Sequence, residues 1–324
     1  MKIKRFTLVV SVALAHVFVP RVSAAEKVGR CETVAPFECI QVTVEGAGPD
    51  VVLVPGLFGS SFGFRRLVPL LVDAGYRTVV IEPLGVGFSS RPPDSDYSFA
   101  AQARRLATVL DRMGVVHPIL VSHSVGTAMA LRLALLDPAR VGAIVSIEGG
   151  PVEEVTTPGF RRAMKLAPLL KLLGPGHVIK GRVRGMLQSR SGDPSWVTDA
   201  VVDGYSAGPA RNLDATLDAF SQMAKAREPE ALRPRLSEVR CPVWLLLGQA
   251  PHEGGPTDAE IATFRAGLPH FTVSHVAGAG NFIFEEAPQT IVRIVQEMTT
   301  TAARAALATN SSDSARPPIP RSRP

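Results

Sequence analysis

The chain has 324 residues, of which 46% are hydrophobic and 20% are charged, so it can bury a full core and suits one large α/β domain better than two independent domains. Its formal net charge of +6 comes from basic residues at the two ends, while residues 25–298 are close to neutral. The charge therefore gives no reason to expect a nucleic acid or an acidic substrate as a partner.

The first 24 residues have the pattern of a secretory signal peptide. Basic residues precede an apolar run from Phe6 to Val19, and small residues stand before Ala25, where a signal peptidase would cut. A membrane anchor is the alternative, but the run is shorter than the ~20 apolar residues that cross a bilayer, and it ends at Pro20. We therefore predict a secreted or periplasmic protein that has no stable membrane anchor after signal removal.

The cysteines and histidines give no metal-binding pattern. Cys31 and Cys39 lie on either side of Pro36 in a predicted β-hairpin, where an exported protein can form a disulfide; the alternative is two small strand residues. Cys241 then has no partner and is expected to pack in the core. The histidines are scattered singly, with no His-x-His or His-Glu-x-x-His pattern, so we predict no metal site and no cofactor.

Short apolar runs alternate with longer helical patterns along the chain, which is typical of parallel strands buried on both faces. The predicted strands are residues 51–54, 78–81, 119–121, 143–147, 243–247 and 272–276. The predicted helices are residues 64–74, 99–112, 127–136, 258–267 and 288–298. This alternation predicts an α/β fold with a doubly wound, mostly parallel sheet, whose ligand sits beyond the carboxyl ends of the strands.

Two segments depart from the alternation. Residues 151–239 contain helical patterns broken by Gly and Pro, and we predict that they form a helical cap inserted into a core made of residues 25–150 and 240–298. Residues 299–324 are rich in Ala, Thr, Ser, Arg and Pro and have too little apolar content to pack, so a disordered tail is predicted there.

A strand-turn-helix motif carries the first candidate for chemistry. The sequence Ser-His-Ser-Val-Gly at 122–126 follows a predicted strand and enters an Ala/Leu/Met-rich helix, which is the context of a nucleophile elbow, with Ser122 where Gly is usual. A serine that only caps the helix is the alternative. With this motif the chain resembles the α/β-hydrolase fold superfamily, of the AB hydrolase-1 type, from about Ala35 to Met298. The resemblance implies that Ser124 is the nucleophile and that the Val125 amide is an oxyanion donor.

Two further loops are similar to those of the same superfamily. The loop at 54–61 matches the His-Gly loop after the third strand, with Pro55 in place of His, and the resemblance implies that Leu57, or else Phe58, supplies the second oxyanion amide. The loop at 82–92 matches a structural turn beside the pocket. The side chain before Gly56 is not itself required, because the group that binds the oxyanion is a backbone amide.

The acid of the family's triad is missing from its usual place. The loop after the strand at 243–247 carries Pro251 where the resemblance leads us to expect an acid. Some relatives, haloalkane dehalogenases among them, place the acid one strand earlier, and Glu148 stands at that position. A glutamate there is either a catalytic acid or part of the scaffold, where it is solvated or holds the cap.

The family's catalytic histidine is missing as well. The stretch at 278–288 matches the family pattern closely and places Asn281 where the histidine belongs. An amide cannot accept the hydroxyl proton at neutral pH, so ordinary triad catalysis is not expected. Of the other imidazoles, His123 is expected to point away from the pocket and His275 to belong to the last strand. His252 is the best substitute, because Gly254 and Gly255 would let its loop bend inward.

These observations lead to one hypothesis and two alternatives. The hypothesis is an exported serine hydrolase, of the carboxylic ester class, that acts on a small ester or related acyl substrate with an incomplete triad; Ser124, Glu148, Asn281 and His252 are its candidate side chains. The first alternative is a cofactor-free lyase, isomerase or cyclase that uses the same pocket. The second is a pseudoenzyme that binds a ligand without chemistry.

Overall fold

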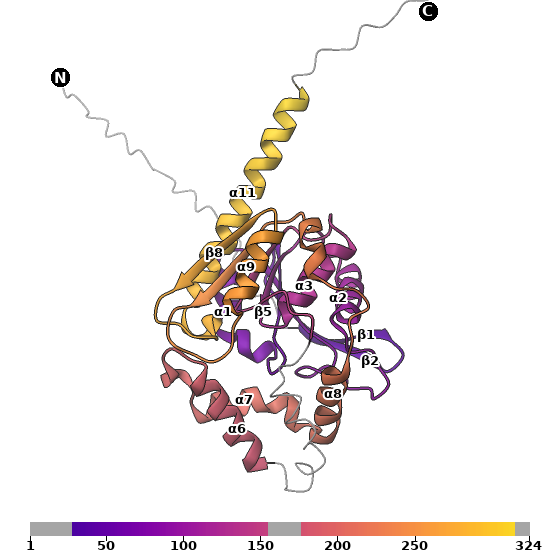
Figure 1. Cartoon of the computed structure of the whole chain (residues 1–324), viewed down its shortest axis with the longest axis vertical. Coiled ribbons are helices and arrows are strands. Elements are labelled where there is room, and N and C mark those ends of the chain that lie inside the picture. The colour runs from indigo at the N-terminus through magenta and orange to yellow at the C-terminus, as the bar shows by residue number, and fades with distance from the viewer. Residues whose placement is uncertain (1–27, 155–175, 315–324) are drawn as a thin grey trace, which may run out of the picture.

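Eight strands form one sheet in the computed structural model, which describes residues 28–154 and 176–314 (Figure 1). The strands are β1 (Val28–Ala35), β2 (Glu38–Glu45), β3 (Asp50–Val54), β4 (Arg77–Glu82), β5 (Ile119–His123), β6 (Ala143–Ile147), β7 (Val243–Gly248) and β8 (Phe271–Val276). Their order across the sheet is β1-β2-β4-β3-β5-β6-β7-β8. The pairs among β3 to β8 are parallel, and β1 and β2 add an antiparallel edge. The predicted doubly wound, mostly parallel sheet is confirmed.

Helices cover both faces of this sheet. They are η1 (Ser61–Arg66), α1 (Leu67–Asp73), α2 (Phe99–Met113), α3 (Gly126–Leu136), α9 (Asp258–Gly267), α10 (Ile283–Glu286) and α11 (Pro288–Ser314). Alternate residues of β3 belong to two separate apolar clusters, one shared with α2, α3 and α9 and the other with α1 and α11. The central strands are therefore buried on both sides, which explains why they read as continuous apolar runs.

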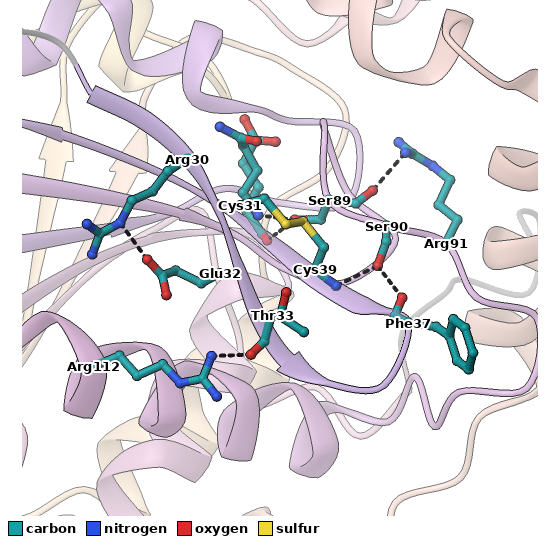
Figure 2. The surroundings of a disulfide bond; sticks show 12 residues. Arg30, Cys31, Glu32, Thr33, Phe37, Cys39, Ser89, Ser90, Arg91 and Arg112 are labelled. Carbon is teal, nitrogen blue, oxygen red and sulfur yellow. Dashed lines mark hydrogen bonds and ion pairs between the residues drawn. A yellow bond between two sulfur atoms is a disulfide. The ribbon is translucent and has the colours of Figure 1, made fainter.

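The antiparallel edge is a hairpin closed by a disulfide. Cys31 of β1 bonds to Cys39 of β2, with a Cα–Cα distance of 5.5 Å that suits such a bridge (Figure 2). The hairpin is held to the next loop because the Cys39 amide donates to the Ser90 hydroxyl at 2.8 Å. Of the two interpretations of these cysteines, the disulfide is the one present in the structure.

The segment between β6 and β7 is helical wherever it is described. It contains α6 (Gly176–Ser189), η2 (Pro194–Trp196), α7 (Asp199–Ala210), α8 (Leu213–Lys225) and η3 (Arg233–Glu238). Figure 1 shows α6, α7 and α8 together at one end of the sheet, while α11 projects from the opposite end. These helices therefore lie over one edge of the sheet.

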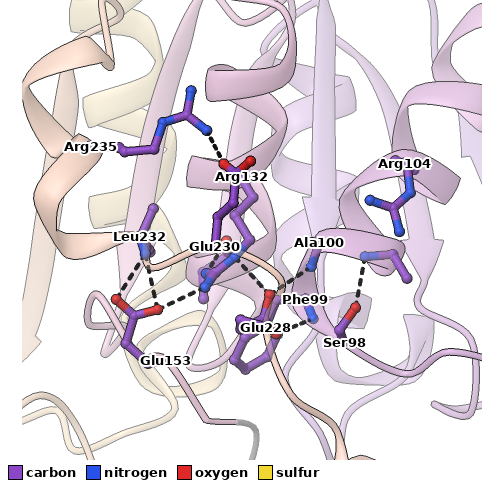
Figure 3. A network of polar contacts seen from close by, with 12 residues as sticks. Ser98, Phe99, Ala100, Arg104, Arg132, Glu153, Glu228, Glu230, Leu232 and Arg235 are labelled. Atoms are coloured by element: carbon purple, nitrogen blue, oxygen red, sulfur yellow. Dashed lines mark hydrogen bonds and ion pairs between the residues drawn. The ribbon is translucent and has the colours of Figure 1, made fainter.

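One arginine attaches both ends of this segment to α3. Arg132, almost fully buried, lies 2.9 Å from the Glu153 carboxylate and 3.0 Å from that of Glu228 (Figure 3). Glu153 also accepts from the Leu232 amide at 2.8 Å, and Glu228 accepts from the Phe99 amide at the start of α2. The segment thus leaves and rejoins the core at a shared ionic network.

The structure differs from the sequence prediction at the C-terminal end. Disorder was predicted from Thr299, but α11 continues to Ser314. The residues after Thr299 are rich in alanine, which has the highest intrinsic helix propensity, so the helix extends without needing an apolar face. The predicted signal peptide, residues 155–175 of the predicted cap and the last ten residues of the tail lie outside the described residues. No helix in the described part of the chain is long and apolar enough to cross a membrane.

Candidate active site

Ser124 stands at the apex of a tight turn between β5 and α3. Its φ of 52° lies in the left-handed region, which non-glycine residues adopt at a cost and which is frequent at functional sites. The turn is fixed from both sides, because the Ser124 amide donates to the Ile147 carbonyl at 2.9 Å and its carbonyl accepts from the Thr127 amide at 3.0 Å. This backbone places the Ser124 side chain beyond the carboxyl end of the central strands.

Small residues and paired hydroxyls pack beneath this turn. Ser122 and Ser146, both fully buried, share hydrogen bonds of 3.0 and 2.8 Å with the Thr127 hydroxyl that lies between them. A side chain on Gly126 would come within 2.9 Å of the Val54 carbonyl. Ser122 therefore replaces the usual glycine without strain, because its hydroxyl has a partner.

Two backbone amides next to Ser124 remain available. Among the residues that the structure describes, neither the Leu57 amide nor the Val125 amide donates a hydrogen bond. Val125 is the N-cap residue of α3, and Leu57 lies in the loop after β3, whose turn is closed by a bond from the Gly59 amide to the Gly56 carbonyl at 2.9 Å. Both residues line the same cavity as Ser124. The arrangement offers two fixed donors to an oxyanion beside the Ser124 hydroxyl.

The cavity in front of Ser124 has a volume of about 150 Å³. Its floor is the loop 55–60 and the turn 123–125, its side is the stretch 281–284, and the helical segment supplies Met186, Arg190 and Tyr205. The wall is mostly apolar and aromatic. The space suits a small substrate held by a few polar groups.

Asn281 and His123 hydrogen-bond to each other inside this cavity. The Asn281 Oδ1 lies 3.0 Å from the His123 Nε2, and the Asn281 amide donates to the Arg190 carbonyl at 2.8 Å. Burial lowers the pKa of His123 to about 4, outweighing the hydrogen bond that Nε2 donates to Asn281. The imidazole is therefore neutral at pH 7, with its proton on Nε2, facing the carboxamide oxygen.

The position of His123 corrects the sequence prediction, which expected it to point away from the pocket. The side chain lines the cavity, and its ring packs edge-on against Phe284 with centroids 4.9 Å apart. The alternation of side chains along β5 predicts opposite faces for neighbouring residues, but the left-handed backbone of Ser124 breaks that alternation. Both side chains consequently border the same space.

Comparison with known proteins supports the same architecture. Residues 49–168 match the family described as the alpha/beta hydrolase fold. The sn-1-specific diacylglycerol lipase ABHD11 of Mus musculus is 27% identical over 253 residues, which cover 74% of this chain and 78% of the lipase. Bifunctional epoxide hydrolase 2 of the same organism is 32% identical over 116 residues, 36% of this chain. That match spans only 21% of the epoxide hydrolase.

Solved structures agree with the sequence matches. An alpha/beta hydrolase fold protein from Burkholderia ambifaria superposes with a TM-score of 0.71 and 22% identity, covering 84% of this chain and 99% of that one. The epoxide hydrolase CorEH gives a TM-score of 0.72 at 15% identity, covering 85% and 99%. The chain has the α/β-hydrolase fold. The two relatives named above, a lipase and an epoxide hydrolase, are both hydrolases.

In this α/β-hydrolase fold protein, Glu148 pairs with His252 and not with the residue at 281. The Glu148 carboxylate lies 3.4 Å from the His252 Nε2 and also accepts from the Gly248 amide. The His252 Nδ1 donates to the Ala250 carbonyl at 2.7 Å, so both ring nitrogens are engaged. Burial raises the pKa of Glu148 against the opposing effect of its partners.

The loop that carries His252 does bend inward at its two glycines. Gly254 and Gly255 have φ values of 97° and 78°, and a Cβ on Gly254 would stand 3.2 Å from the Asn281 Nδ2. The His252 side chain nevertheless does not line the cavity, and within the described chain no imidazole hydrogen-bonds to the Ser124 hydroxyl. His275 is exposed on the edge strand β8, in agreement with its placement in the last strand. The candidate residues thus form two separate pairs near Ser124: His123 with Asn281, and Glu148 with His252.

Sequence reasoning did not find the cavity residues of the helical segment. Tyr205 donates to the Glu285 carboxylate at 2.8 Å, and Arg65 pairs with the same carboxylate. Arg190 follows α6 directly, and nothing in the local pattern marks it as part of a site. Such residues reach the cavity through the packing of helices that are distant in the chain, so only the fold identifies them.

Metal ligands are not gathered anywhere in residues 28–154 and 176–314. No group of three or more His, Cys, Asp or Glu side chains in these ranges could hold a metal ion. The arrangement around Ser124 consists of a hydroxyl, backbone amides, a neutral imidazole and a carboxamide. Those groups suit acyl chemistry through a hydroxyl and an oxyanion site.

Proposed function

We propose that the protein is a serine hydrolase that acts on small ester or related acyl substrates, with Ser124 as its nucleophile. The observation that carries the proposal is the position of Ser124: it stands at a left-handed turn, in a cavity where the Leu57 and Val125 amides have no other described acceptor. A hydroxyl nucleophile attacking a carbonyl creates a negative oxygen, which these amides stabilise. Ester chemistry uses all three groups.

His123 is the proton acceptor in this proposal, although a weak one. Because Nε2 donates its proton to the Asn281 oxygen, Nδ1 carries the lone pair and accepts no hydrogen bond from the described residues. Nδ1 lies 3.0 Å from the point where a Gly56 Cβ would stand. The Ser124 Cβ lies 3.2 Å from that same point. Asn281 orients the imidazole as the third group of a triad does. With a pKa of about 4, the imidazole takes up a proton poorly, so turnover is slow.

In this proposal Glu148 and His252 act together, without direct contact with the Ser124 hydroxyl. The loop that carries His252 borders Asn281, and a buried acid-imidazole pair can accept a proton from water. We assign the pair to the water that resolves the acyl-enzyme. Loss of a triad member usually lowers turnover by ~10⁴ to 10⁶, while an oxyanion site alone retains ~10³ over water. The proposed enzyme therefore works well below the rate of a complete triad.

A ligand-binding protein without turnover is the second candidate. It is favoured by one observation: among the described residues, none hydrogen-bonds to the Ser124 hydroxyl. A cofactor-free lyase, isomerase or cyclase would use the same amides to polarise a carbonyl without acylation. These alternatives differ from the proposed hydrolase in leaving Ser124 unmodified.

Covalent labelling separates them. The folded protein is incubated with a fluorophosphonate, and intact mass and peptide mapping are used to find the adduct. The proposal predicts one adduct on the peptide that contains Ser124, no adduct on Ser124→Ala, and full labelling of Ser189→Ala, which removes an exposed hydroxyl of α6. An unlabelled folded protein, or equal labelling of Ser124→Ala, would contradict it.

Export is the remaining part of the proposal. Its support is the leader-like pattern of residues 1–24 together with the disulfide of the first hairpin, since such bridges persist in oxidising compartments. Expression in a bacterial host, followed by N-terminal sequencing of the periplasmic fraction, should give a mature chain that begins close to Ala25. A full-length chain retained in the cytoplasm would contradict export.

A further inference from the structure

Arg190 is a cation in the wall of the candidate active site. It follows α6 directly and lines the cavity together with Ser124 and Asn281. Its backbone is fixed, because its carbonyl accepts from the Asn281 amide at 2.8 Å. The guanidinium is therefore carried on the stretch that meets the position of the missing family histidine.

The guanidinium has no anionic partner within the described chain. No ion pair joins Arg190 to an acidic side chain there, and its Nε is buried without a hydrogen-bond partner. Burial lowers the pKa of Arg190, because it removes water from around the charged group. A partly desolvated cation without a counter-charge is costly, which is why such groups are usually paired.

One acidic side chain acts on Arg190 electrostatically without forming an ion pair with it. Glu253 raises the pKa of Arg190 through its charge, but it is exposed on the loop after β7, where it contacts the Ser189 hydroxyl at 3.5 Å. The buried Arg132, by contrast, is paired with Glu153 and Glu228. Arg190 is thus available to a group from outside the chain.

A second unsatisfied donor borders the same cavity. The Ser60 hydroxyl is buried and has no hydrogen-bond partner among the described residues, and Ser60 lies in the loop that also carries Leu57. Arg190 and Ser60 both line a cavity whose remaining wall is mostly apolar, and each has a buried donor without a partner in the described chain. A ligand with a concentrated set of acceptors satisfies both.

We propose that Arg190 binds a carboxylate of the substrate, so that the protein selects small acyl substrates that carry a negative charge. A carboxylate matches the planar donor set of a guanidinium, and a cavity of about 150 Å³ brings that group close to the carbonyl over Ser124. This inference rests on the proposed function in one respect, namely that the bound carboxylate belongs to a substrate. The anion-binding role of Arg190 itself is independent of turnover. Arg190 is a specificity-determining residue in this account.

The first test measures selectivity in the full-length protein. The kcat/KM values are compared for the monomethyl and the dimethyl esters of malonate, succinate, glutarate and adipate. Wild type should prefer at least one monoanionic ester to its neutral counterpart, and Arg190→Gln should lower that preference roughly 10- to 100-fold, the usual worth of a charge-assisted hydrogen bond. Arg190→Lys should retain part of the preference, and Arg182→Gln, which removes an exposed charge from α6, should retain all of it.

The second test does not depend on catalysis. Titration calorimetry measures the binding of the four free dicarboxylates to Ser124→Ala and to the double variant Ser124→Ala with Arg190→Gln, after thermal unfolding has shown that both are folded. The proposal predicts binding that weakens roughly 10- to 100-fold in the double variant and with added salt. Undetectable binding of all four acids, or equal binding by both variants, would overturn it. If binding follows Arg190 while Ser124 resists the fluorophosphonate, the proposed hydrolase fails and the anion site stands.

Discussion

At the level of single residues, Asn281 fixes the state of its neighbour His123. The Asn281 carboxamide occupies the expected histidine position and holds the His123 imidazole by its Nε2. Burial and the nearby Arg190 both disfavour the charged ring, so His123 is neutral over the whole physiological range. The pocket therefore keeps an imidazole, but one of low basicity.

This environment predicts a defined pH dependence of stability. Because the folded pKa of His123 is about 4 and the unfolded value is 6.5, the unfolded state binds more protons between these limits, and stability falls as pH drops from 6.5 to 4. The free energy of unfolding of wild type relative to His123→Gln should therefore decrease by roughly 3 kcal/mol over that range. Urea denaturation at several pH values measures it.

The control for this prediction is His275→Gln, which removes an exposed imidazole from β8. Its free energy of unfolding relative to wild type should stay constant with pH. Buried carboxyls such as Glu148 and Glu285, whose pKa values burial raises, act in the opposite direction in every variant and cancel in the difference. A His123→Gln difference that does not change between pH 4 and 7 would disprove the neutral, buried state of this ring.

At the level of elements, α3 connects the turn of Ser124 to the helical segment. The helix begins two residues after Ser124, and Arg132, two turns further on, holds Glu153 and Glu228 at the two ends of that segment (Figure 3). Removing the cation leaves two carboxylates close together at a largely buried site, which usually costs more than the pair contributes. The ends of the segment depend on this one side chain.

We therefore expect Arg132→Met to lower the free energy of unfolding by about 3 kcal/mol, because it leaves buried charge uncompensated. The matched control is Arg104→Met on α2, whose guanidinium is exposed and 3.7 Å from an exposed aspartate. That substitution should cost less than about 1 kcal/mol. If urea denaturation gave the same loss in free energy of unfolding for both variants, the stabilising role of the Arg132 network would be contradicted.

The elements themselves could be predicted from the sequence, whereas the contacts between distant elements could not. Runs such as 51–54 and 243–247 are apolar because both faces of their strands are buried, so their strand character is visible locally. The elbow at Ser124 is likewise a local motif. The direction of His123 and the presence of Arg190 in the wall depend on a left-handed turn and on the packing of α6, which no local pattern contains.

At the scale of the whole molecule, the sheet gathers separate loops at one edge. The parallel register of β3, β5, β6 and β7 brings the loops after these strands to the same side, where α6 and α7 cover them (Figure 1). The Leu57 and Val125 amides, Ser124, Glu148 and Asn281 thereby lie in loops at one edge of the sheet. In the proposed hydrolase, this site lacks an effective proton acceptor at residue 281.

Restoring that acceptor tests the account directly. The kcat/KM for p-nitrophenyl acetate at pH 7.5 is measured for wild type, Asn281→His, Asn281→Gln and the double variant Ser124→Ala with Asn281→His. A positioned general base is worth about 10²- to 10⁴-fold, so Asn281→His should gain within that range, while Asn281→Gln gains nothing and the double variant loses the gain. A folded Asn281→His protein with no increase over wild type would contradict the claim that the site is a hydrolase centre lacking only its base.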